Sequence, residues 1–108
     1  MKTLLIITAL LLGSISYGQM KTVVIHTSAE CNECKDRLET MLNYKKGVQF
    51  AELDVPSRDL TVKYNENKIT LDQIKKDISE LGYDADEQKA DSKAQGKLPA
   101  CCRPAGHE

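Results

Sequence analysis

The chain has 108 residues, 15 Lys and Arg against 16 Asp and Glu, a formal net charge of −1 and no tryptophan. This length is enough for one small domain with a modest core. No basic stripe is present that could neutralise a phosphate backbone, which excludes nucleic acid as an expected partner. With one Phe and four Tyr, an aromatic-lined pocket for an organic ligand would be hard to build.

The first eighteen residues have the three regions of a secretory signal peptide. Lys2 precedes an apolar run from Leu4 to Leu12, and the small-residue exit Ser16-Tyr17-Gly18 follows. The run is well short of the ~20 residues that span a bilayer, so we expect cleavage near Gly18 rather than an anchor. The mature product is expected to be an exported monomer that does not span the membrane, and to be periplasmic or secreted.

The first half of the remaining chain predicts a strand followed by a helix. Residues 21–27, KTVVIHT, are rich in β-branched side chains and bounded by polar ones, as in a strand. Apolar residues then recur at helical spacing at Cys34, Leu38, Met41 and Leu42. We therefore expect a helix over roughly 32–45, which Gly47 ends after two lysines.

The next segments predict a hairpin and a second helix. Residues 48–55 and 60–66 alternate apolar and polar side chains across the turn sequence Pro-Ser-Arg-Asp. Thr70 is placed to cap a helix, with Gln73 three residues on as in a capping box. Gly82 closes this helix, and residues 83–85 leave room for only a short last strand.

The predicted order is strand, helix, strand, strand, helix, strand. Right-handed crossovers would place both helices on one face of a four-stranded antiparallel sheet, which is the ferredoxin-like βαββαβ sandwich. We expect three parts: a signal peptide at 1–18, the folded domain at 20–86, and a Cys- and His-containing tail at 87–108. The tail is charged and lacks periodic apolar residues, so it is predicted to be flexible.

Two cysteines, Cys31 and Cys34, stand three residues apart where the first strand is followed by the first helix. This places Cys31 in an exposed loop and Cys34 in the first helical turn, where unpaired N–H groups favour thiolate over thiol. The spacing lets both sulfurs turn toward one point. Two thiolates suit Cu⁺ or Hg²⁺, whereas structural zinc takes four ligands.

The CxxC motif at this junction, with Gly47-Val48 opening the second strand and Gly82-Tyr83 after the second helix, resembles the heavy-metal-associated domain. The resemblance covers roughly residues 20–86, and the signal peptide makes the secreted mercury-binding or copper-chaperone type the nearest comparison. It implies a metal carrier rather than an enzyme, with Cys31 and Cys34 as ligands and Tyr83 packed beside them. It also implies delivery to a metal-transporting membrane protein or to another CxxC domain.

Other donors leave the metal and its coordination open. Residues 28–30 are Ser-Ala-Glu, where the family usually has Gly-Met-Thr. The Glu30 carboxylate would be a suitable ligand for Zn²⁺. The alternative is that it stays in solvent and interacts favourably with the positive N-terminal end of the helix. Cys101, Cys102 and His107 are candidate additional ligands on a long tether. Four alternatives stay open for these residues: they complete the CxxC metal site, form a second metal site, link to the CxxC pair by a disulfide, or have no role.

Two alternative functions use the same cysteines. A thiol–disulfide oxidoreductase would have Cys31 as the attacking sulfur, but no aromatic residue precedes it and no Gly-Pro separates it from Cys34. In the second alternative, the four cysteines form two structural disulfides. However, a disulfide within the CxxC motif closes too short a loop to restrict the unfolded chain much.

Overall fold

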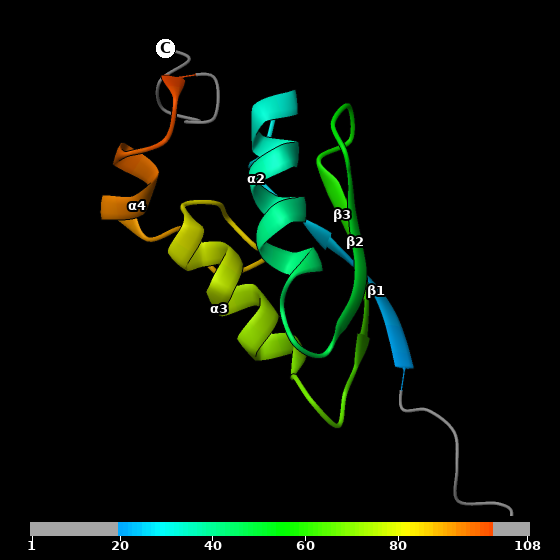
Figure 1. The fold of residues 1–108 in the computed structure, drawn as a ribbon. Coiled ribbons are helices and arrows are strands. Elements are labelled where there is room, and N and C mark those ends of the chain that lie inside the picture. The colour runs from blue at the N-terminus through cyan, green and yellow to red at the C-terminus, as the bar shows by residue number, and fades with distance from the viewer. Residues whose placement is uncertain (1–19, 101–108) are drawn as a thin grey trace, which may run out of the picture.

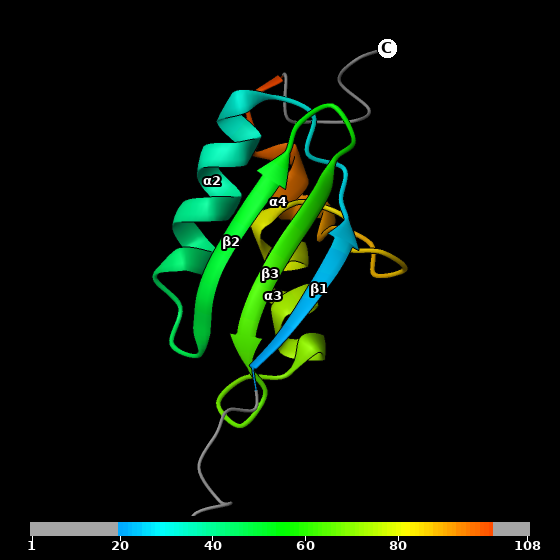
Figure 2. The ribbon, with the colours of Figure 1, turned by 90° about the vertical axis from the view of Figure 1, so that its right-hand side faces the viewer.

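The computed structural model describes residues 20–100. The predicted signal peptide and the tail donors Cys101, Cys102 and His107 lie outside these residues. The elements in chain order are β1 (Met20–His26), α2 (Asn32–Asn43), β2 (Val48–Asp54), β3 (Asp59–Asn65), α3 (Leu71–Leu81) and α4 (Ser92–Gly96). Both α2 and α3 lie against the same face of the sheet (Figures 1 and 2).

The sheet has β3 in the centre, paired antiparallel with β1 on one side and β2 on the other. Leu60 is opposite both Ile25 and Leu53 in the register. All three side chains are buried, because alternate residues of paired strands point to one face. This row fixes the inner face of the sheet, and its burial makes a one-residue slip costly.

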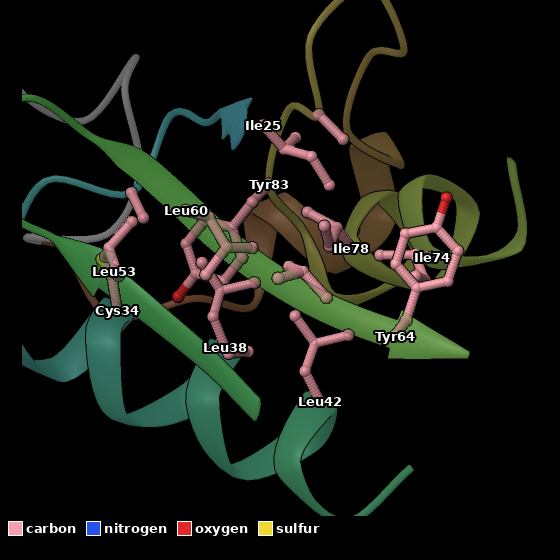
Figure 3. Close-up of a cluster of buried hydrophobic side chains, with 14 of the residues drawn as sticks. Ile25, Cys34, Leu38, Leu42, Leu53, Leu60, Tyr64, Ile74, Ile78 and Tyr83 are labelled. Carbon is pink, nitrogen blue, oxygen red and sulfur yellow. The ribbon is translucent and has the colours of Figure 1, made fainter. Parts of the chain in front are cut away.

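The helices complete the core by placing an apolar stripe on that inner face. Leu38 and Leu42 come from α2, and Ile74 and Ile78 come from α3; all four are fully buried (Figure 3). Each such side chain contributes roughly 1.5–3 kcal/mol when it leaves water. Thr70 caps α3 as predicted, accepting a 3.1 Å bond from the Gln73 amide.

The prediction of a fourth strand is wrong, since the sheet within residues 20–100 has three strands. After α3 the chain meets the end of β1 through an isolated bridge between Ala85 and Thr27. The Asp86 amide donates to the His26 carbonyl, and the His26 amide donates to Asp86 Oδ1, both at 2.8 Å. Asp86, at φ 52°, then turns the backbone, and the amides of Ala85 and Gln88 each donate to the other's carbonyl at 2.9 Å. This turn takes the chain away from β1 before a strand can extend along its edge.

Within the segment that was predicted to be flexible from residue 87, the structure describes a short helix and a buried side chain. Residues 92–96 form α4, whose cap Asp91 accepts a 2.9 Å bond from the Ala94 amide. Leu98 is 5% exposed and joins the core. A single apolar side chain gives no periodicity in the sequence, so pattern reading could not reveal this docking.

Among the described residues, no helix combines the length and apolar character needed to cross a membrane.

Candidate metal centre

The CxxC pair lies at the start of α2, with one sulfur outside the helix and one inside its first turn. Cys31 is the N-cap residue, and its Sγ accepts the Cys34 amide at 3.4 Å. The Cys31 carbonyl accepts the Lys35 amide at 3.0 Å. Cys31 is half-buried and Cys34 is fully buried. The helix start therefore sets the orientation of both sulfurs, as the spacing predicted.

The two Sγ atoms lie 3.0 Å apart. Two zinc–sulfur bonds of about 2.3 Å at a tetrahedral angle would hold them about 3.8 Å apart. A tetrahedrally bound zinc ion would therefore require the two Sγ atoms to move apart by about 0.8 Å. The sulfurs converge on one point, which is the arrangement that a shared soft ion requires.

Cys34 takes part in a disulfide bond. Its partner is not Cys31, because the 3.0 Å between their sulfurs far exceeds the ~2.05 Å of an S–S bond. Residues 20–100 contain no cysteine besides these two. The structure thus describes Cys34 in an oxidised state, and a dithiolate site requires the reduced form.

The loop before Cys31 is held by hydrogen bonds from two distant parts of the chain. The backbone N–H and Oγ1 of Thr27 both donate to the Arg58 carbonyl, at 2.9 and 3.0 Å, and the Ala29 amide donates to Thr27 Oγ1 at 3.1 Å. Ser28 Oγ accepts the Asp84 amide at 2.9 Å. Ala29 is fully buried, so this loop is packed although it lacks the methionine usual in the family.

Glu30, the candidate oxygen ligand, forms an ion pair with Arg58, whose guanidinium nitrogen lies 3.1 Å from its Oε1. This partner comes from the turn between β2 and β3. No group of three or more His, Cys, Asp or Glu side chains is arranged to hold a metal within residues 20–100. The described donors therefore amount to the two sulfurs.

A polar stripe on α2 fixes this helix to the outer edge of β2, a contact that sequence analysis missed. Glu39 accepts the Leu53 amide at 2.8 Å and Lys35 Nζ at 2.6 Å. Asn43 accepts the Ala51 amide at 2.8 Å and donates to the Ala51 carbonyl at 3.2 Å. The hydrogen bond to Glu39 is the main cause that raises the pKa of Lys35. The spacing of four residues was the available signal.

Tyr83 lies directly after α3 and is fully buried in the core. Its hydroxyl end is directed toward the part of the core that holds Cys34 (Figure 3). The packing of Tyr83 beside the two cysteines of the metal site stays a prediction.

Comparison with known proteins gives a family match and several relatives. Residues 23–84, more than half of the chain, match the family model of the heavy-metal-associated domain. The copper chaperone CopZ of Staphylococcus haemolyticus (strain JCSC1435) is 35% identical over 54 residues, which are 50% of this chain and 79% of that protein. A copper-exporting P-type ATPase of Staphylococcus saprophyticus is 33% identical over 70 residues, 63% of this chain but only 9% of the ATPase.

Two solved structures share the fold. A CopZ metallochaperone aligns with a TM-score of 0.58 at 27% identity, covering 60% of this chain and 98% of that one. Oxidised MerP from Ralstonia metallidurans CH34 aligns with a TM-score of 0.58 at 18% identity, covering 61% and 93%. At 18% identity, the similarity to MerP shows a shared fold and nothing more.

Proposed function

The chain belongs to the heavy-metal-associated domain family, and from that premise we propose that its reduced form carries one soft metal ion on Cys31 and Cys34. We favour Cu⁺ because the relatives described above are a copper chaperone and a copper-exporting ATPase. Hg²⁺ and Zn²⁺ are the alternatives, since both bind thiolates. The protein acts as a carrier and passes the ion on by ligand exchange.

The observation that carries this proposal is the convergence of two sulfurs, 3.0 Å apart, at the start of one helix. Two sulfur ligands leave an ion with free coordination positions that a partner's thiolate can enter. Each sulfur–metal bond broken is replaced by one to the partner, so the ion keeps its charge and no redox step is needed. Cys31 is the half-buried member of the pair, so we expect exchange to begin there.

We propose that the partner is a metal-transporting membrane protein or another CxxC domain. The partner's thiolates would reach the ion at the N-terminal start of α2, where Cys31 and Cys34 lie. The first eighteen residues support export to a periplasm or out of the cell, which would make this protein a carrier outside the cytoplasm.

Anaerobic titration of the fully reduced full chain with Cu⁺, Hg²⁺ and Zn²⁺ tests the proposal. We expect one equivalent of a soft ion to bind, with Cu⁺ held against a colorimetric chelator. A Cys31→Ser, Cys34→Ala double variant should lose this binding, while Glu30→Gln, one residue away, should keep it if the two sulfurs suffice. A reduced wild-type chain that binds none of the three ions would refute the carrier function.

A thiol–disulfide oxidoreductase is the second candidate, because Cys34 is in a disulfide and Cys31 Sγ lies 3.0 Å from its sulfur. Such an enzyme would catalyse repeated reduction of a disulfide substrate. Turnover of insulin disulfides with a thiol reductant distinguishes the two functions. We expect no rate above that of the Cys31→Ser variant.

A further inference from the structure

We propose that Arg58, in the turn between β2 and β3, is a positioning residue that keeps the Glu30 carboxylate from joining the two sulfurs, and that it thereby favours Cu⁺ over Zn²⁺. The contact between Arg58 and Glu30 is a feature of the structure. Its effect on the choice of metal rests on the function proposed above, because it concerns the ion that Cys31 and Cys34 hold.

The Glu30 carboxylate is the oxygen ligand closest in the sequence to the CxxC motif. Glu30 directly precedes Cys31, and its side chain is long and rotatable. Zn²⁺ takes four ligands in structural sites, and a carboxylate oxygen is one of its usual ligands. Cu⁺ prefers soft sulfur ligands, so the same oxygen adds little to its binding. A carboxylate that joined the two sulfurs would therefore strengthen the binding of Zn²⁺ far more than that of Cu⁺.

An ion pair directs this carboxylate toward the turn between β2 and β3. Arg58 Nη1 lies 3.1 Å from Glu30 Oε1. Within residues 20–100, no three His, Cys, Asp or Glu side chains are arranged to hold a metal, so Glu30 does not form such a set with Cys31 and Cys34. The carboxylate is thus paired with a cation instead of being placed as a third ligand.

The backbone of Arg58 is fixed to the loop that leads into the CxxC motif. The Arg58 carbonyl accepts hydrogen bonds from the Thr27 amide at 2.9 Å and from Thr27 Oγ1 at 3.0 Å. The Arg58 amide donates to the Asp54 carbonyl at 2.8 Å. These bonds involve only backbone atoms of Arg58. A change of its side chain therefore tests the ion pair without removing the link between the turn and the loop.

The backbone conformation of Arg58 does not explain why an arginine stands in this turn. Its φ is 64°, in the left-handed region that glycine and asparagine adopt more readily than arginine. The guanidinium group, in contrast, has a defined contact with Glu30. The side chain thus has a role that the shape of the turn alone does not require.

Solvent limits the strength of this restraint. The Arg58 side chain is 47% exposed and the Glu30 side chain 30% exposed, and exposed ion pairs are weak. The pair competes with a bond from the Glu30 carboxylate to Zn²⁺. We therefore expect its removal to tighten Zn²⁺ binding by roughly three- to tenfold and not by orders of magnitude.

The Zn²⁺ and Cu⁺ affinities of the fully reduced full chain, each measured by competition with a chelator, test this role. Arg58→Gln removes the charge and keeps a long polar side chain. We expect this variant to bind Zn²⁺ roughly three- to tenfold more tightly than the wild type, with its Cu⁺ affinity within about twofold. An unchanged Zn²⁺ affinity, or an equal gain for both ions, would overturn the proposal.

Two further variants separate the ion pair from a general effect of charge. Arg58→Lys keeps a cation at this position and should keep the Zn²⁺ affinity of the wild type, whereas a gain equal to that of Arg58→Gln would contradict a role for the charge. The double variant Glu30→Gln, Arg58→Gln lacks the carboxylate and should lose the gain. A gain that persists in this double variant would mean that the lost charge acts on the ion directly, against the proposal.

The result for Arg58 can be told apart from a failure of the carrier function. A reduced wild type that binds no Cu⁺ would refute the carrier. Even then, Zn²⁺ binding that Arg58→Gln gains and the double variant loses would support the restraint of Glu30 by Arg58. Normal Cu⁺ binding, with no effect of Arg58→Gln on Zn²⁺, would refute that restraint alone.

Discussion

Cys31 Sγ lies 3.0 Å from Cys34 Sγ, with the first residue capping α2 and the second buried in its first turn. One short stretch of backbone thus holds two sulfurs in different environments. The Cys34 side chain is buried in the core, whereas the Cys31 side chain is half-buried and follows the loop at the end of β1. In the proposed carrier function, the Cys34 sulfur would retain the ion while the Cys31 sulfur exchanges it.

Replacement of each cysteine should separate metal binding from folding. Cys31→Ser retains a good N-cap side chain, so we expect a change in unfolding free energy within about 1 kcal/mol. Cys34→Ala removes a buried sulfur and should cost about 1–2 kcal/mol. Each variant should bind Cu⁺ at least a hundredfold more weakly, measured by chelator competition after full reduction. Wild-type affinity in either variant would remove that sulfur from the site.

Gly82→Ala tests the docking of the C-terminal segment. Gly82 has φ 116°, and an added Cβ would lie 3.0 Å from Leu98 Cδ1 and 3.1 Å from the Ala94 backbone. We expect a loss of about 1–3 kcal/mol and faster amide exchange in α4. Gly96→Ala is the matched control, because its Cβ meets nothing within 4 Å. If both variants behaved alike in urea denaturation, the packing of Leu98 on Gly82 would contribute nothing to stability.

Asn43→Ala tests the attachment of α2 to the edge of β2. The change leaves the Ala51 amide and carbonyl without the side chain that now meets both. We expect a loss of about 1–2 kcal/mol in unfolding free energy, measured by urea denaturation. Thr40→Ala, at an exposed position of the same helix, is the control. Equal stability of the two variants would show that solvent replaces the Asn43 bonds without cost.

The junction between α3 and the C-terminal segment should weaken in acid. The backbone N–H of Glu87 and the Lys75 ammonium group lower the pKa of the Glu87 carboxyl from its ordinary value of 4.5. A lowered pKa means that the stabilisation is complete above pH 4.5 and is lost as the pH falls below it. Amide exchange of residues 87–98 should therefore show a steeper acid dependence in the wild type than in Glu87→Gln. Identical pH profiles would mean that the ion pair does not hold the junction.

Local patterns predicted the elements up to the end of α3. Alternation placed β2 and β3, Thr70 and Gly82 marked the ends of α3, and the position of the CxxC pair at the start of α2 is confirmed. These features depend on residues close together in the sequence. The periodicity and capping rules describe such short-range effects directly.

The features that were missed depend on contacts across the fold. The turn at Asp86 replaces the fourth strand, and the chain after it is hydrogen-bonded to Ser79 of α3. Leu98 docks as a single apolar residue, and the contacts of Glu39 and Asn43 are with a neighbouring strand. None of these leaves a repeating pattern in the sequence.

X-ray absorption of the fully reduced full chain, loaded with one equivalent of Cu⁺, is the most direct test that two sulfurs of one motif share one ion. We predict sulfur neighbours around copper in the wild type, and no bound copper in the Cys31→Ser, Cys34→Ala double variant. Copper retained by that variant, or a wild-type site without sulfur neighbours, would contradict the proposed carrier.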